Sequence, residues 1–191
     1  ADNPFLKKSE IALLQGAMGE NELLSRRNGR FAVNEGLVYP EFDERVHVIE
    51  PFSVPFEWQD CISIDPGLNN PLAALWFCVD FDHNVYAVAE HYEAKRDIDY
   101  HAEAIKKTSA ALGWHTDGKG RLNALIDSAA NQRTLAGSKS VSELFYERGV
   151  NVNANVNKDL FAGIARVKSA LKGENGKPRL YIFSNCVNLI R

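Results

Sequence analysis

The feature that most constrains this chain is a group of three apolar runs that follow one another closely. They cover residues 61–64, 72–79 and 85–91, and each has the length of a strand. Short turns at residues 65–67 and 80–84, rich in aspartate, asparagine, proline and glycine, separate them. A parallel pair needs a long crossover, so strands joined by short turns pair antiparallel. The sequence therefore predicts an antiparallel meander of three strands.

Helical and strand patterns alternate after this meander. Helices are predicted over residues 97–112, 140–148 and 159–171, with strands over 122–126 and 150–156 between them. Crossovers of this kind produce parallel strands with helices on the faces of the sheet. The order β-β-β-α-β-α-β-α thus predicts an α/β fold with a mixed sheet, three antiparallel strands and then parallel ones, flanked by helices. This is the arrangement of the ribonuclease H-like fold, which serves many functions.

The length of 191 residues, 45% of them hydrophobic, suits one domain with a small appendage. Residues 1–56 are expected to be a linker segment of short helices and strands. Residues 57–191 are expected to be the main domain, with 180–183 either a last strand or a buried run. The chain begins like the middle of something longer.

Charge and cysteine content limit the classes of function. The net charge of −3 does not indicate nucleic-acid binding, which would have to come from a local basic patch or from bound metal. The three cysteines are far apart in sequence, so neither a disulfide framework nor a zinc site is expected. Together with the absence of an 18-residue apolar stretch, this favours a cytoplasmic protein.

Asp65 and Asp127 are the strongest candidates for chemistry, because each is the first polar residue after a short apolar strand. If the two strands are neighbours, their carboxylates converge and repel each other unless a divalent cation lies between them. Mg²⁺ and Mn²⁺ prefer oxygen ligands, and a pair of such ions can activate water to hydrolyse a phosphodiester. The alternative is that both residues serve only as turn or helix-capping residues, roles that aspartate favours.

Four further residues are weaker candidates. Glu90 ends the third strand and is a possible third metal ligand, although a solvated glutamate is the commoner case. Arg133, Lys139 and Lys158 follow the fourth and fifth strands and are possible DNA phosphate contacts. The alternative for these three is an ordinary solvated charged surface.

Two other kinds of active site are excluded because their sequence motifs are absent. The glycine-containing segments at residues 137–140 and 173–178 lack the G-x-x-x-x-G-K-[ST] pattern of an ATP-binding loop. The chain also lacks the G-x-S-x-G pattern that presents a nucleophilic serine in many hydrolases.

The chain also resembles the large terminase subunits of phages. Residues 2–6, 28–31 and 35–42 resemble the segment that joins the two domains of these proteins, and 61–67 and 124–129 resemble strands of their nuclease domain. Val156-Asn157-Lys158 and the following Gly163-Ile164 and Val167 resemble the lysine and helix that come next. The resemblance covers essentially the whole chain through the order and spacing of these pieces.

This resemblance implies a nuclease that cuts concatemeric viral double-stranded DNA, with an ATPase domain upstream in the same polypeptide. It implies two Mg²⁺ or Mn²⁺ ions held by an acidic cluster, with Asp65 and Asp127 matching the first two carboxylates. The third is expected beyond residue 191. Implied partners are DNA, the portal protein and the small terminase subunit. The alternatives are another ribonuclease H-like nuclease, such as a resolvase, or a non-catalytic module that docks DNA or the portal.

Overall fold

The computed structural model describes residues 37–67, 70–132, 138–174 and 176–191. The chain divides into two compact units, residues 1–40 and 41–191. Most of the expected linker segment, residues 1–36, lies outside the described residues. Residues 41–56 belong to the second unit, because they include a strand of its sheet. In the described ranges, no helix has the length and apolar character that crossing a membrane requires.

The second unit has the predicted strands and helices in the predicted order, with additional elements at both ends and a short 3-10 helix after the fourth predicted strand. The helices are α3 (Glu44–His47), α4 (Ile98–Leu112), η1 (Ser128–Asn131), α5 (Val141–Glu147), α6 (Leu160–Lys172) and α7 (Val187–Ile190). The strands are β1 (Val48–Ile49), β2 (Gln59–Asp65), β3 (Leu72–Val79), β4 (Val85–Glu93), β5 (Leu122–Ile126), β6 (Val150–Asn153) and β7 (Leu180–Phe183).

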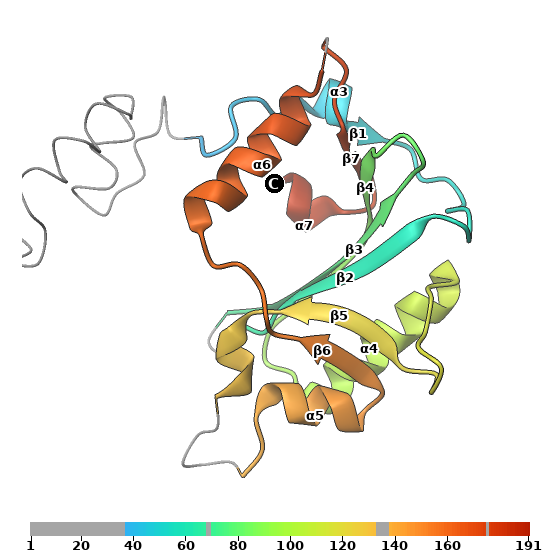
Figure 1. Ribbon diagram of the computed structural model, residues 1–191, viewed down its shortest axis with the longest axis vertical. Helices are drawn as coiled ribbons and strands as arrows, with labels where there is room; N and C mark the ends of the chain where they lie inside the picture. The colour runs from blue at the N-terminus through green and yellow to red at the C-terminus, as the bar shows by residue number, and fades with distance from the viewer. Residues whose placement is uncertain (1–36, 68–69, 133–137, 175) are drawn as a thin grey trace, which may run out of the picture. The chain divides into compact units, whose positions relative to one another are not determined.

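One mixed sheet organises this unit (Figure 1). Its strand order among the described residues is β1-β7-β4-β3-β2-β5-β6. Strands β2, β3 and β4 form the predicted antiparallel meander, whereas β5 and β6 run parallel to β2. The predicted mixed sheet is therefore confirmed. β7 is a strand that lies parallel between β4 and β1, a position that the sequence did not reveal.

Three helices begin one residue later than predicted, because the first predicted residue caps the helix. Asp97 accepts a hydrogen bond from the Tyr100 amide at the start of α4, and Asp159 caps α6 in the same way. Ser140 forms a reciprocal capping box with Glu143 at the start of α5. Strand β6 is shorter than predicted and ends at Asn153 rather than near residue 156.

In β2, β3 and β5 the buried side chains lie on the face of the sheet that α4 covers, whereas in β7 the adjacent Ile182 and Phe183 are both buried. Strands β2, β3 and β5 alternate between buried side chains on this face and partly or fully exposed ones on the other. Trp76 is fully buried, and its Nε1 donates to Ser109 Oγ of α4 at 2.9 Å. This hydrogen bond satisfies two buried polar groups and joins α4 to the centre of the sheet.

Strand β4 departs from simple alternation. A β-bulge opposite Trp76 and Phe77 shifts its register, so that Ala87, Val88 and Ala89 are all buried in succession. The regular alternation of side chains along a strand therefore fails at the centre of β4. Past the bulge, Glu90 is partnered with Leu75 and faces the side of the sheet opposite α4.

A partly buried histidine pair gives the fold a dependence on pH. His91 Nε2 and His101 Nδ1 lie 2.8 Å apart, and burial is the main cause that lowers the pKa of each imidazole. The unfolded chain therefore binds protons more readily than the folded one, so stability present above about pH 6.5 is lost as the pH falls.

We expect thermal unfolding to show this loss between about pH 7.5 and about pH 5.5. For a protein of this size, each loss of about 1 kcal/mol lowers Tm by about 2–4 °C. His91→Gln should flatten the pH profile, whereas His83→Asn in the exposed turn after β3 should leave it unchanged. A profile in His91→Gln identical to that of the native protein would show that the pair is not responsible.

Candidate active site at the ends of β2 and β5

The register of the sheet brings the ends of two strands together. Ile64 of β2 and Ile126 of β5 are direct partners in a parallel pair, and Asp65 and Asp127 are the next residue of each chain segment. Neighbouring strands lie about 4.8 Å apart. Asp65 is exposed and Asp127 partly exposed, on the face of the sheet opposite α4. The topology on which their candidacy depended, two adjacent strands with the same direction, is therefore present.

Asp127 combines a capping role with an ionic contact. Its Oδ1 accepts a hydrogen bond from the Ala129 amide at 2.7 Å, which caps η1, and lies 3.2 Å from Lys158 Nζ. The hydrogen bond from the Ala129 amide, and after it the contact with Lys158, lowers the pKa of this carboxyl group below its usual value. Asp127 is therefore an anion throughout the neutral range.

Asp65 also makes a local turn contact, since its Oδ1 accepts a hydrogen bond from the Gly67 amide at 3.4 Å. Both aspartates thus have the turn and capping roles that were the alternative to chemistry. In the ranges that the structure describes, however, Oδ2 of Asp65 and Oδ2 of Asp127 accept no hydrogen bond. One oxygen of each carboxylate is available for another ligand.

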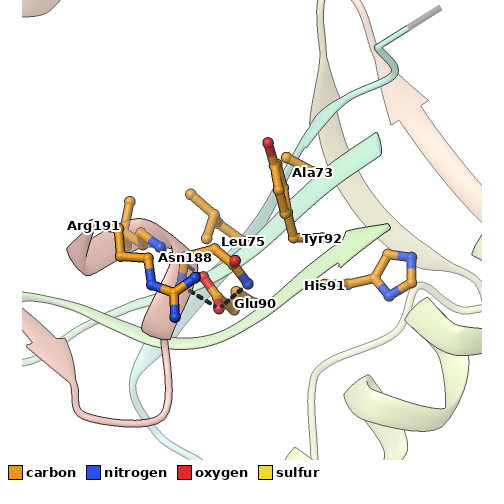
Figure 2. A pocket seen from close by; sticks show the side chains of 8 residues that line it. Ala73, Leu75, Glu90, His91, Tyr92, Asn188 and Arg191 are labelled. Carbon is orange, nitrogen blue, oxygen red and sulfur yellow. Dashed lines mark hydrogen bonds between the residues drawn. The ribbon is translucent and has the colours of Figure 1, made fainter. Parts of the chain in front are cut away.

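Glu90 has a clear structural role beside this site. Its two carboxylate oxygens accept hydrogen bonds from the Asn188 amide and side chain and from the Leu189 amide, all at 2.8–2.9 Å. These groups are at the start of α7, so Glu90 acts as a remote cap that fastens α7 to β4 (Figure 2). The expected metal-binding role of Glu90 would compete with these bonds, and it stays a prediction.

The three basic candidates have different surroundings. Lys158 lies against Asp127, as described above. Lys139 forms an ion pair with Glu147 of α5, with its Nζ 2.6 Å from Oε1, and would have to leave this partner to meet a phosphate. Arg133 lies outside the described residues. Of the two described residues, Lys158 lies at the site beside Asp127, whereas Lys139 is paired with Glu147.

Sequence reasoning did not single out Tyr92, which shares a row with Asp65. Asp65 is partnered with Ala73 of β3, and Ala73 with Tyr92 of β4, so the three side chains leave the same face. Tyr92 is half exposed and lines a cavity of about 390 Å³ together with Glu90 and Asn188 (Figure 2). Because side chains on one face of a strand repeat every two residues, the position of Glu90 in the sequence could have identified Tyr92.

Asp65 and Asp127 supply part of the ligand set that a hard divalent cation needs. Two adjacent carboxylates with free oxygens are the ligand type that Mg²⁺ and Mn²⁺ prefer. Within the described ranges, no group of three or more histidine, cysteine, aspartate or glutamate side chains is placed to hold a metal ion. Asp65 and Asp127 therefore supply two ligands, and water or a phosphate oxygen would have to supply others.

Comparison with solved structures identifies the fold. The nuclease domain of the P22 large terminase is similar with a TM-score of 0.64 and 16% identity, over 81% of this chain and 75% of that one. The large terminase of a thermophilic bacteriophage gives 0.60 and 20%, over 100% of this chain and 44% of that one. The large terminase nuclease of the thermophilic phage G20c gives 0.51 and 13%, over 80% and 77%.

Sequence comparisons give no match, either to protein-family models or to curated proteins. The chain spans less than half of the second of these three proteins, so it corresponds to one part of that large terminase. The mixed sheet, its strand order and the structural neighbours agree with the predicted fold class. The chain has the ribonuclease H-like fold of large terminase nuclease domains.

Proposed function

We propose that this chain is the nuclease domain of a viral DNA-packaging motor, and that it cuts double-stranded DNA with the help of Mg²⁺ or Mn²⁺. The observation that carries the proposal is the adjacency of Asp65 and Asp127 at the ends of two neighbouring parallel strands. Both carboxylates are accessible to solvent, so a DNA backbone can approach them. The fold likeness to large terminase nuclease domains supports the same conclusion.

The proposed roles follow from the contacts at the site. Asp65 and Asp127 would hold the cation, which supplies water activation and charge neutralisation when it is bound. The Ala129 amide and the Gly67 amide fix the orientation of the two carboxylates, since each donates to Oδ1 and, among the described residues, Oδ2 has no hydrogen-bond donor. Lys158 lies beside Asp127, where a phosphate of the substrate would benefit from a positive charge.

The proposal extends to the DNA substrate, the cellular location and the partner proteins. The DNA would be concatemeric viral DNA, cut when packaging begins and ends in the cytoplasm of a bacterial host. The ATPase domain of the same polypeptide, the portal protein and the small terminase subunit would be its partners. Glu90, Lys139 and Arg133 keep the weaker roles predicted for them, a metal ligand and two DNA contacts.

Metal dependence tests this function directly. We expect the complete subunit to nick or linearise plasmid DNA in Mn²⁺ or Mg²⁺ and to be inactive in EDTA, because two carboxylates alone provide no activated water. Activity should return when metal is added in excess of EDTA. Equal cleavage with and without EDTA, or no cleavage with either metal by a subunit that still binds DNA, would contradict the proposal. The second result would favour a docking module.

A further inference from the structure

Three asparagines form a patch beside the two aspartates, on the face of the sheet opposite α4. Asn123 of β5 and Asn151 of β6 are direct partners, and Asn153 is partnered with Leu125 of β5. All three asparagines are exposed. Neither β5 nor β6 contains a charged residue. We call Asn123, Asn151 and Asn153 the amide patch.

The patch shares a face and an end of the sheet with the candidate active site. Leu125 is partnered with Ser63 of β2, and Asp65 is two residues beyond Ser63 on the same face. Side chains on one face of a strand repeat every two residues, about 6.8 Å. The row of Asn153 is therefore one step from the two aspartates, and the row of Asn123 is two steps away.

Internal hydrogen bonds fix the orientation of the side-chain amides of Asn123 and Asn153. Asn151 Nδ2 donates to Asn123 Oδ1 at 2.9 Å, and the Asn155 amide donates to Asn153 Oδ1 at 2.9 Å. Two acceptor oxygens are thus used within the protein. In the ranges that the structure describes, Asn123 Nδ2 and Asn153 Nδ2 donate to no protein acceptor. The patch therefore presents the Nδ2 donors of Asn123 and Asn153, together with Asn151 Oδ1, which accepts no hydrogen bond in the described ranges.

We propose that Asn123 and Asn153 bind phosphate oxygens of a DNA strand that leads to Asp65 and Asp127. Phosphate oxygens only accept hydrogen bonds, and asparagine is one of the side chains that commonly contact them. β5 and β6 carry no acidic residue that would repel a DNA backbone over the amide patch itself. This inference rests on the proposed function, because it takes the same DNA as its ligand.

The test exchanges the donors for acceptors without disturbing the internal bonds. In Asn123→Asp and Asn153→Asp a carboxylate oxygen still accepts from Asn151 or from the Asn155 amide, whereas the outward donor is lost. We expect the double variant of the complete subunit to bind a fluorescent DNA duplex at least about tenfold more weakly in EDTA, where no cleavage occurs. Asn123→Leu, which removes the donor without adding charge, should weaken binding by a smaller factor.

Lys107→Glu provides the matched control, because it changes the net charge by the same two units. Lys107 is exposed on α4, which covers the opposite face of the sheet. The control should bind DNA within about twofold of the native subunit, and all variants should keep the native Tm. Equal losses in the control and the double variant, or native affinity in the double variant, would overturn the inference.

The outcome is separable from that of the proposed function. If the native subunit shows metal-dependent cleavage but the double variant binds DNA normally, the amide patch has no role and the nuclease assignment stands. If the double variant loses affinity but the native subunit never cleaves DNA, the patch is a DNA contact and the nuclease assignment falls.

Discussion

Asp127→Asn in the complete subunit should lower Mn²⁺-dependent plasmid cleavage by about 10³-fold or more. A metal ion contributes several kcal/mol to stabilising the charge of such a transition state, and each ~1.36 kcal/mol corresponds to a factor of ten in rate. Asparagine retains an oxygen that accepts from the Ala129 amide, so the turn at the start of η1 stays intact. The loss would therefore report the carboxylate charge rather than a damaged fold. Asp65→Asn should behave in the same way.

Two comparisons make this result specific. Asp82→Ala, in the exposed turn between β3 and β4, should cleave plasmid at the native rate, since that turn is at the other end of β3 from Ala73. DNA affinity measured in EDTA should stay close to native in all three variants. If Asp65→Asn and Asp127→Asn both cleave DNA normally, the two residues are only turn and capping residues. The chemistry would then have to be sought elsewhere.

Trp76→Ala should destabilise the protein by about 3–5 kcal/mol, the usual range for removing a large buried aromatic side chain. Trp76 lies at the centre of the meander with no exposed surface, and it also holds Ser109 of α4 through its indole nitrogen. Its removal leaves a cavity and an unpaired buried hydroxyl at once. Urea unfolding followed by circular dichroism would measure the change in the free energy of unfolding.

A large exposed aromatic residue provides the control for this prediction. Phe81 is 78% exposed in the turn after β3, so Phe81→Ala should change the free energy of unfolding by less than about 0.5 kcal/mol. Trp76→Phe should fall between the two, because it keeps most of the buried surface but leaves Ser109 without its donor. A cost of less than about 1 kcal/mol for Trp76→Ala would mean that the core is not organised around β3.

Much of the fold could be predicted from the chain because local signals agreed with one another. Short turns required antiparallel pairing of β2, β3 and β4, and amphipathic segments required crossovers to β5 and β6. The position of β7 between β4 and β1 had no such signal, since it depends on a parallel pairing between residues about a hundred positions apart. The bulge in β4 was equally hidden, because its sequence of small apolar residues fits either face.

The candidate site, like the fold, could be predicted only in part from the sequence. Asp65 and Asp127 could be singled out because each follows an apolar run, and adjacency then depended on strand order alone. The contact between Lys158 and Asp127 spans 31 residues and could not be inferred from local sequence. Glu90 looked like a third acidic ligand in sequence. Its bonds to the start of α7 are visible only once the helix is folded against β4.

The most direct test of the central claim is anomalous diffraction from crystals of the complete subunit soaked in Mn²⁺. We predict a Mn²⁺ peak that lies about 2.1 Å from a carboxylate oxygen of Asp65 and at the same distance from one of Asp127. Crystals saturated with Mn²⁺ that show no peak in contact with either residue, or two carboxyl groups directed away from each other, would contradict the account.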